Sequence, residues 1–90
     1  MRRVHVWITG RVQGVFFRAN TRNEAVKLDL KGWVKNLPDE RVEALFEGDD
    51  KATNHMLRFC RRGPFGSKVD DVEIVEEKYK GEFESFEIRY

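Results

Sequence analysis

Apolar and polar residues alternate near the start of the chain, from Val4 to Gly10. Val4, Val6 and Ile8 lie on one face of this segment, and the polar face starts with His5. A period of two predicts a β-strand with one buried face. Similar patterns predict strands over residues 32–37, 41–48 and 69–79, and a short last strand over residues 86–90.

Helical spacing interrupts the strand pattern at two places. The first helix is expected from about residue 18 to residue 31, with an apolar stripe formed by Ala25 and Leu28 with Val26 and Leu30 beside them. The second helix is expected to begin after a cap formed by Asp49 or Asp50. Its inward-facing residues are predicted to be Ala52, Met56, Phe59 and Cys60.

Two signals bear on the ends of the first helix. Thr21 and Glu24 have the spacing of a capping box, which would place the helix start one turn later. Lys31 followed by Gly32 would end the helix, because a cation suits the last turn and glycine readily adopts positive φ.

The predicted element order is βαββαβ with a short extra C-terminal strand. This order is typical of a ferredoxin-like α+β sandwich, in which two helices cover one face of an antiparallel sheet. Ninety residues leave room for one core, so we expect residues 1–90 to form a single domain. The fold alone does not predict a function, because it carries many unrelated activities.

Composition excludes several classes of function. Seventeen basic residues against sixteen acidic ones give a net charge of +1, without the basic excess of a nucleic-acid binder. No apolar run approaches the roughly 20 residues that span a bilayer, and the N-terminus does not resemble a signal peptide. The single Cys60 forms no internal disulfide and fits a reducing cytoplasm. We expect a cytoplasmic monomer that contacts neither membrane nor nucleic acid.

The loop after the first strand is the best candidate for chemistry. Gly10 and Gly14 allow successive backbone N–H groups to converge into an anion-binding nest. A helix starting near Arg18 would add its own unpaired N–H groups, and Arg18 would add a planar, permanently charged fork. Spacing alone is explained equally well by a tight turn beside a surface arginine. The loop lacks the Gly-Lys-Ser/Thr of a nucleotide-binding P-loop, and it also lacks the dinucleotide-binding glycine fingerprint.

Cysteine and histidine offer weaker candidates. Cys60 precedes two arginines, but the arginine that a cysteine phosphatase needs six places later is replaced by Gly66. Packing in the core is the better interpretation of Cys60. His5 and His55 are far apart in sequence and lack metal-ligand spacing, so we expect exposed or rim positions for both and no metal site.

Two long segments resemble the signatures of one family. The run ITGRVQGVFFR, residues 8–18, resembles the first signature of the acylphosphatases. The run GWVKN, residues 32–36, followed by Val42 and Gly48, resembles the second. The similarity continues to residues 86–88 and is strongest to small stand-alone members of prokaryotic type. One position departs: Glu40 stands where the family usually has glycine, which would strain the hairpin by about 1 kcal/mol if φ is positive.

The resemblance implies a specific activity and specific residues. It implies hydrolysis of the carboxyl–phosphate bond of acyl phosphates, without metal or cofactor. Arg18 would bind the phosphate, and Asn36 would orient the attacking water. The remaining phosphate-binding groups would be the backbone N–H groups of Gly14, Val15, Phe16 and Phe17.

The same resemblance leaves some roles open. Taken alone, Asn36 reads as a polar residue that ends a strand. Thr21 would bond within the site or cap the helix, and the terminal carboxylate of Tyr90 would pair with Arg18 if the last strand lay beside the second. Acetyl phosphate, carbamoyl phosphate and bisphosphoglycerate share the reactive group and are equally compatible.

Two other functions compete with this interpretation. Ferredoxin-like sheets also bind RNA through exposed aromatics, and Trp7 and Tyr79 are candidates for stacking on bases. The third predicted strand, residues 41–47, lacks the motif of such sheets and carries acids that would repel phosphates. The second competitor is an inactive or regulatory acylphosphatase-like domain, as at the N-terminus of a hydrogenase maturation protein. The chain carries no further domain, so we expect the stand-alone enzyme.

Overall fold

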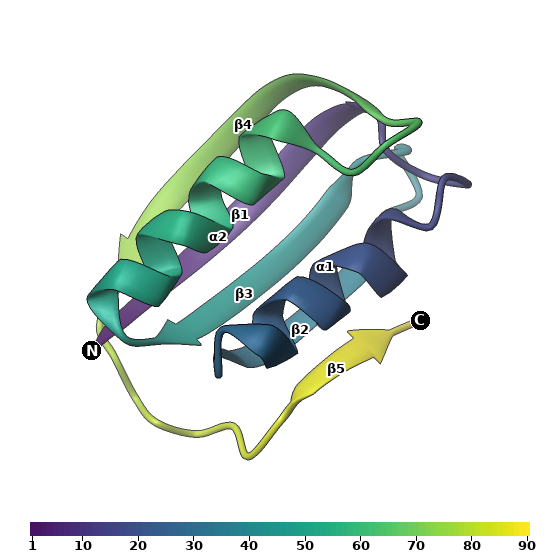
Figure 1. The fold of residues 1–90 in the computed structure, drawn as a ribbon. Coiled ribbons are helices and arrows are strands. Elements are labelled where there is room, and N and C mark those ends of the chain that lie inside the picture. Colours follow the sequence, from purple (N-terminus) through teal and green to yellow (C-terminus); the bar gives the residue numbers. More distant parts are fainter.

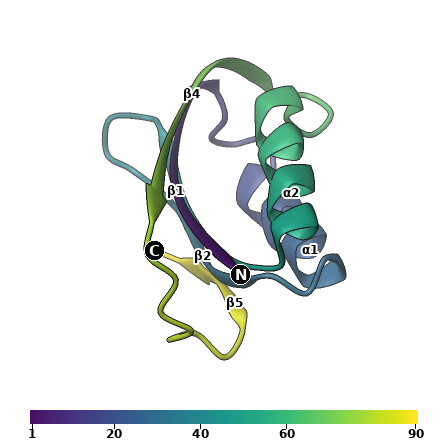
Figure 2. The ribbon, with the colours of Figure 1, turned by 90° about the vertical axis from the view of Figure 1, so that its left-hand side faces the viewer.

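The computed structural model describes residues 1–90, which form one sheet with two helices on one of its faces (Figures 1 and 2). Along the chain the elements are β1 (Arg2–Arg11), α1 (Phe17–Lys27), β2 (Lys31–Asn36), β3 (Val42–Gly48), α2 (Asp50–Arg62), β4 (Lys68–Glu77) and β5 (Phe86–Arg89). The strand order across the sheet is β4-β1-β3-β2-β5. The ferredoxin-like α+β fold is therefore confirmed. Neither helix has the length and apolar character needed to cross a membrane.

One detail of the sheet differs from the prediction. The pairs β1–β3, β1–β4 and β2–β3 are antiparallel, as expected, but β5 runs parallel to β2. The sheet is therefore mixed rather than antiparallel. The reason is topological: β4 and β5 occupy opposite edges, and the connection between them passes along one end of the sheet before β5 begins (Figure 1). The C-terminal strand does lie beside the second strand.

The alternating positions of the strands form the core. Residues of β1 and β3 that were predicted to share a face are fully buried beneath the helices: Val4, Val6, Ile8, Val42, Ala44 and Phe46. On α2, Met56, Phe59 and Cys60 are buried as predicted, but Thr53 takes the fully buried place expected for Ala52. On α1, Val26 is exposed, and the buried face consists of Phe17, Thr21 and Ala25.

The first helix is shorter at its C-terminal end than the sequence predicted. It ends at Lys27, whereas Lys31 already belongs to β2. Asp29 adopts φ +58°, and its N–H and that of the next residue donate to the carbonyls of Val26 and Ala25 at 3.1 and 2.8 Å. This pair of bonds is a Schellman motif, which usually carries glycine at the left-handed position. Aspartate replaces the expected glycine, so the end signal was missed.

Two glycines serve close approach between strands. Gly10 lies within β1 next to an irregularity after Thr9, and a Cβ there would stand 2.1 Å from the carbonyl oxygen of Lys68. At Gly32 in β2 a Cβ would stand 1.9 Å from the carbonyl oxygen of Leu45. The expectation that Gly10 shapes the anion loop is therefore wrong, as is the expectation that Gly32 ends the helix.

The two helices are capped differently at their N-termini. Asp49 caps α2, and its side chain accepts hydrogen bonds from the N–H groups of Lys51 and Ala52 at 3.0 and 3.3 Å, which confirms the predicted cap. The first helix begins at Phe17, so the predicted cap at Thr21 is wrong. Its N-cap is Phe16, which offers no side-chain hydrogen bond.

The hairpin between β2 and β3 contains the residue that departs from the family pattern. Glu40 has φ +75°, and its N–H donates to the carbonyl of Leu37 at 3.2 Å. We expect Glu40→Gly to raise the free energy of unfolding by about 0.5–1 kcal/mol, because a left-handed L-residue costs more than the entropy that glycine adds. Thermal unfolding would show a melting temperature higher by several degrees. Glu40→Ala keeps the strain, so an equal gain in that variant would contradict this account.

An ion-pair cluster lies on the sheet face opposite the helices. The guanidinium of Arg3, only 8% exposed, contacts the carboxylates of Glu47, Glu77 and Glu82 at 3.1, 2.8 and 2.5 Å. Burial alone would raise the pKa of the Glu47 carboxyl. Hydrogen bonds from backbone N–H groups and from Arg3 outweigh this effect, so the pKa of Glu47 lies below its ordinary value. Hydrogen bonds from Arg3 and His5 lower the pKa of Glu77.

The cluster also fixes the chain that leads to β5. Glu47 accepts hydrogen bonds from the N–H groups of Lys80 and Gly81 at 2.9 and 3.3 Å. Both donors belong to the connection between β4 and β5. This connection has no regular structure of its own, so the buried carboxylate anchors it to the sheet.

This cluster predicts a loss of stability in acid. The pKa values of Glu47 and Glu77 in the folded chain lie below the ordinary value of about 4.5. The two carboxylates therefore stabilise the fold above about pH 4.5, and this contribution is lost as the pH falls through the lowered pKa values. We expect the free energy of unfolding, measured with denaturant, to fall in that range. Glu47→Gln should reduce the fall, whereas Glu84→Gln, which removes no ion pair, should not; equal slopes in both variants would contradict the prediction.

Candidate active site

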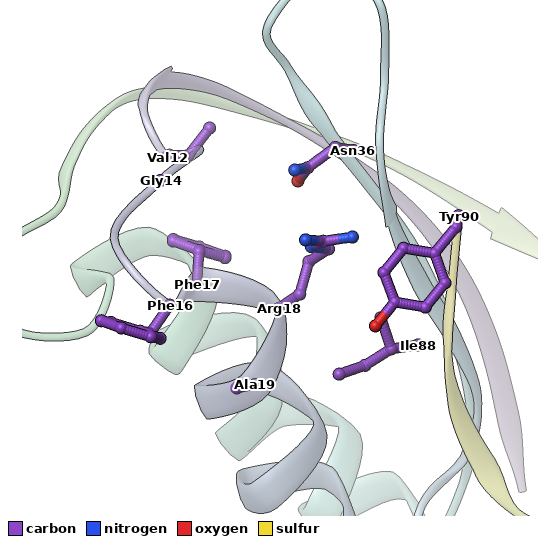
Figure 3. Close-up of a pocket in the computed structure, with 9 residues that line it drawn as sticks. All are labelled: Val12, Gly14, Phe16, Phe17, Arg18, Ala19, Asn36, Ile88 and Tyr90. Carbon is purple, nitrogen blue, oxygen red and sulfur yellow. The ribbon is translucent and has the colours of Figure 1, made fainter.

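A cavity of about 290 Å³ opens where the loop after β1 meets the ends of β2 and β5 (Figure 3). It is lined by Val12, Gly14, Phe16, Phe17, Arg18, Ala19, Asn36, Ile88 and Tyr90. Five residues singled out from the sequence are thus brought together from the loop, α1 and β2. Val15 does not line the cavity, and its side chain packs partly against the core. The role of the Val15 N–H in phosphate binding therefore stays a prediction.

The loop backbone has the geometry of an anion nest. Gly14 has φ +73° and Phe16 has φ +58°, whereas Val15 and Phe17 are not left-handed. Alternation of this kind turns successive N–H groups toward one side of the chain. A bulky residue such as Phe16 is seldom left-handed, and such strain is common at functional sites.

The N–H groups of this segment are free. From Gly14 to Ala19, none of the six backbone N–H groups donates to a protein acceptor. Three of them belong to the loop, and three belong to the first turn of α1. The first turn of α1 contains no acidic residue, so no carboxylate offsets the positive end of the helix dipole. Six donors in a row favour an anion at this helix start.

Arg18 is the only residue with a charged side chain that lines the cavity. It forms no ion pair with any carboxylate of the chain, and its guanidinium carbon lies 4.9 Å from the centre of the Tyr90 ring. The expected pairing of Arg18 with the terminal carboxylate of Tyr90 is not observed. A cation over an aromatic face is held by the ring quadrupole without being neutralised. The guanidinium keeps its hydrogen-bond donors available.

Asn36 is the last residue of β2, and its amide points toward the Arg18 guanidinium (Figure 3). The side-chain Oδ1 is buried and accepts no hydrogen bond. A buried acceptor without a donor costs about 1–3 kcal/mol, so such an atom is seldom left in place without a use. The Oδ1 of Asn36 is therefore suited to accept a hydrogen bond from a bound water or ligand. The hydroxyl of Thr21 is also buried without a partner, and it caps no helix.

Gln13 joins the two halves of the site, and sequence reasoning missed it. Its side-chain Nε2 donates to the backbone carbonyls of Leu37 and Arg41 at 2.8 and 2.9 Å. Leu37 follows Asn36 directly, so Gln13 fixes the anion loop relative to the strand that carries Asn36. Both partners are backbone atoms of a distant hairpin, and no sequence pattern reports such a bond.

Comparison with known proteins identifies the family. The acylphosphatase family model matches residues 4–88. The chain belongs to the acylphosphatase family. It is 54% identical over 89 residues to an acylphosphatase of Syntrophobacter fumaroxidans, covering 99% of this chain and 92% of that protein. It is 50% identical over 90 residues to an acylphosphatase of Syntrophus aciditrophicus, covering 100% and 94%. The crystal structure of acylphosphatase from Bacillus subtilis aligns over both complete chains with a TM-score of 0.95 and 39% identity.

The surroundings of the cysteine and of the two histidines agree with membership of the acylphosphatase family. Cys60 is fully buried, and burial raises the pKa of its thiol to about 12, so it is not a thiolate nucleophile. His5 is partly exposed and lies between Glu43 and Glu77, with ring nitrogens 2.6 and 3.1 Å from their carboxylates. His55 is exposed and approaches a single carboxylate, that of Glu24.

The aromatic residues of the open sheet face are occupied by other side chains. The ring of Trp7 stacks on His5 with centroids 4.0 Å apart. Trp33 receives two cations, with Arg89 and Lys35 at 5.0 and 5.4 Å from its ring centre. These contacts leave fewer free ring faces for bases than an RNA-binding sheet of this fold presents. In this acylphosphatase-family chain, Arg18 and the free N–H groups that precede it therefore lie at the cavity and not on this face.

Proposed function

We propose that this chain hydrolyses acyl phosphates to a carboxylate and inorganic phosphate, using the cavity of Figure 3. The observation that carries the proposal is the meeting of three features at a single cavity: five lining residues with free backbone N–H groups, one unpaired guanidinium and one unpaired amide oxygen. The N–H groups of residues 14–19 and the fork of Arg18 hold the phosphoryl oxygens. Together they stabilise the charge that these oxygens carry in the transition state.

The attacking water is assigned to Asn36. A neutral amide is not a base, but its oxygen accepts a hydrogen bond and so orients the water for in-line attack. The new P–O bond forms from the water oxygen, and the bond between phosphorus and the carboxyl oxygen breaks. One proton of the water passes to a non-bridging phosphoryl oxygen, which gives dihydrogen phosphate and the carboxylate. Atoms and charge balance without an added base.

The leaving group explains why so few side chains are needed. A carboxylate is a weak base and departs without a proton donor, so the site needs no general acid. Fixed N–H donors and a permanent guanidinium supply the electrostatic stabilisation. The proposal therefore assigns no role to a metal ion or cofactor. Retention of activity in the presence of a chelator would support this part.

Hydrolysis of benzoyl phosphate, followed by the change in ultraviolet absorbance, tests the proposal. We expect the purified chain to be active with EDTA present. An inactive chain that binds phosphate would indicate a regulatory acylphosphatase-like domain. An inactive chain that binds single-stranded RNA tightly would favour the binding module. Either result would overturn the proposed function.

The proposal extends to the state in which the chain works. We propose that residues 1–90 act as one domain, as a monomer and in the cytoplasm. One core of 15 buried residues supports the single domain, and the buried thiol of Cys60 fits a reducing compartment. Light scattering on the purified chain tests the monomer, and a mass near 10.7 kDa is expected.

A further inference from the structure

The cavity has an apolar side that phosphate binding does not use. Phe16 is 81% exposed and Tyr90 is 96% exposed, although both line the cavity. Ile88 lines the same cavity and is only partly buried. In Figure 3, Arg18 extends into the space between the loop that carries Phe16 and the strand that carries Ile88 and Tyr90. Ile88 and Tyr90 lie together on one side of Arg18, and Phe16 lies on the other side (Figure 3). We call Ile88 and Tyr90 the apolar wall.

The end of the chain holds the apolar wall in place. Ile88 lies in β5, and Tyr90 follows Arg89, the last residue of that strand. The two residues are two positions apart, and their side chains lie on the same side of Arg18 (Figure 3). Ile88 is opposite Val34 of β2 in the parallel pairing, and the last residue of β5, Arg89, is opposite Lys35, which precedes Asn36. On the other side of Arg18, the start of α1 fixes the backbone of Phe16, whose carbonyl accepts hydrogen bonds from the backbone and the side chain of Asn20 at 3.0 and 2.9 Å.

The charge of the lining residues limits which acyl groups this side of the cavity accepts. Arg18 is the only cation lining the cavity, and the phosphate requires it. A second anionic group on the substrate would meet no cation there and would lose its water against the apolar wall. A small acyl group would leave the wall uncovered. An uncharged apolar acyl group, especially a flat aromatic one, would cover it and gain from burial.

We propose that Ile88 and Tyr90 form an acyl-group subsite that selects acyl phosphates whose acyl part is uncharged and apolar, with aromatic groups preferred. The inference rests on the proposed hydrolysis of acyl phosphates and names the class of substrate for the same cavity. Tyr90 is the specificity-determining residue of this subsite, because its ring lies beside the Arg18 guanidinium and lines the cavity.

The test compares three substrates that share the phosphate: benzoyl phosphate, acetyl phosphate and succinyl phosphate, whose acyl part carries a carboxylate. We expect kcat/KM of the wild-type chain to be highest for benzoyl phosphate, by about ten-fold or more over the other two, since a filled apolar pocket discriminates by such factors. In Tyr90→Ala and Ile88→Ala, the benzoyl-to-acetyl ratio should fall about ten-fold. Tyr90→Phe should keep the ratio, and Val26→Ala, an exposed position of α1 that does not line the cavity, should also keep it.

Inhibition by inorganic phosphate separates the subsite from the phosphate site. Ile88→Ala should leave the inhibition constant of phosphate unchanged, because the ion does not reach the apolar wall. An unchanged benzoyl-to-acetyl ratio of kcat/KM in Tyr90→Ala and Ile88→Ala would overturn the subsite. An equal fall of kcat/KM for both substrates is such a result. A wild-type chain that hydrolyses none of the three substrates would instead overturn the proposed function itself.

Discussion

Arg18→Ala is expected to lower kcat/KM for benzoyl phosphate by about 10³-fold or more, the scale found when a transition-state arginine is removed. Arg18 is the only charged side chain lining the cavity, so no neighbour can replace it. Its guanidinium carbon lies 4.9 Å from the centre of the Tyr90 ring, and no ion pair is lost with Arg18. Steady-state kinetics, together with a thermal unfolding curve close to that of the wild type, would establish the effect.

Two companion variants make the Arg18 result interpretable. Arg18→Lys keeps the charge and loses the planar fork, so we expect activity between those of the wild type and the alanine variant. Arg22→Ala removes an exposed arginine of the same helix that forms no ion pair, and it should behave like the wild type. Near-normal activity in Arg18→Ala, or an equal loss in Arg22→Ala, would contradict the assigned role.

Asn36→Ala is expected to lower kcat by about 10²-fold or more, because a displaced water loses its in-line position. KM should change by no more than a few fold, since the phosphate is held by other groups. The melting temperature should not fall, because the variant removes a buried oxygen that has no donor in the free chain. Measuring kcat, KM and thermal unfolding on the same preparation checks all three expectations.

Asn36→Asp tests whether a neutral hydrogen-bond acceptor is needed at this position to orient the water, or whether any polar side chain is sufficient. A carboxylate accepts the same hydrogen bond, but it places a negative charge beside the phosphate and should raise KM as well as lower kcat. Asn23→Ala replaces an exposed asparagine of α1 outside the cavity and serves as the matched control. A large fall in stability with unchanged kcat in Asn36→Ala would make Asn36 a structural residue only.

The fold was predictable where local pattern decides the structure. The alternation of β1 and β3 and the cap at Asp49 depend on neighbours within a few residues. The end of α1 was missed because Asp29 takes a left-handed conformation that is more typical of glycine. The parallel pairing of β5 was missed because pairing direction depends on the path of the connection, which local pattern does not record.

The residues of the candidate site also differ in how far the sequence predicts them. Arg18 and the loop were visible as a glycine-rich turn before a helix, and the resemblance to the family supplied Asn36. Gln13 was missed because its partners are carbonyls 24 and 28 residues away. The contact of Arg18 with the ring of Tyr90, instead of its carboxylate, depends on where β5 ends beside β2.

The central claim is that one segment of backbone, residues 14–19, holds the phosphate together with Arg18. A heteronuclear NMR titration of the backbone amides with inorganic phosphate tests it residue by residue. The account predicts the largest chemical-shift changes at these six N–H groups, with one shared binding constant and with a strongly weakened response in Arg18→Ala. Unchanged amides at residues 14–19, with the largest changes at another surface such as the start of α2, would contradict it.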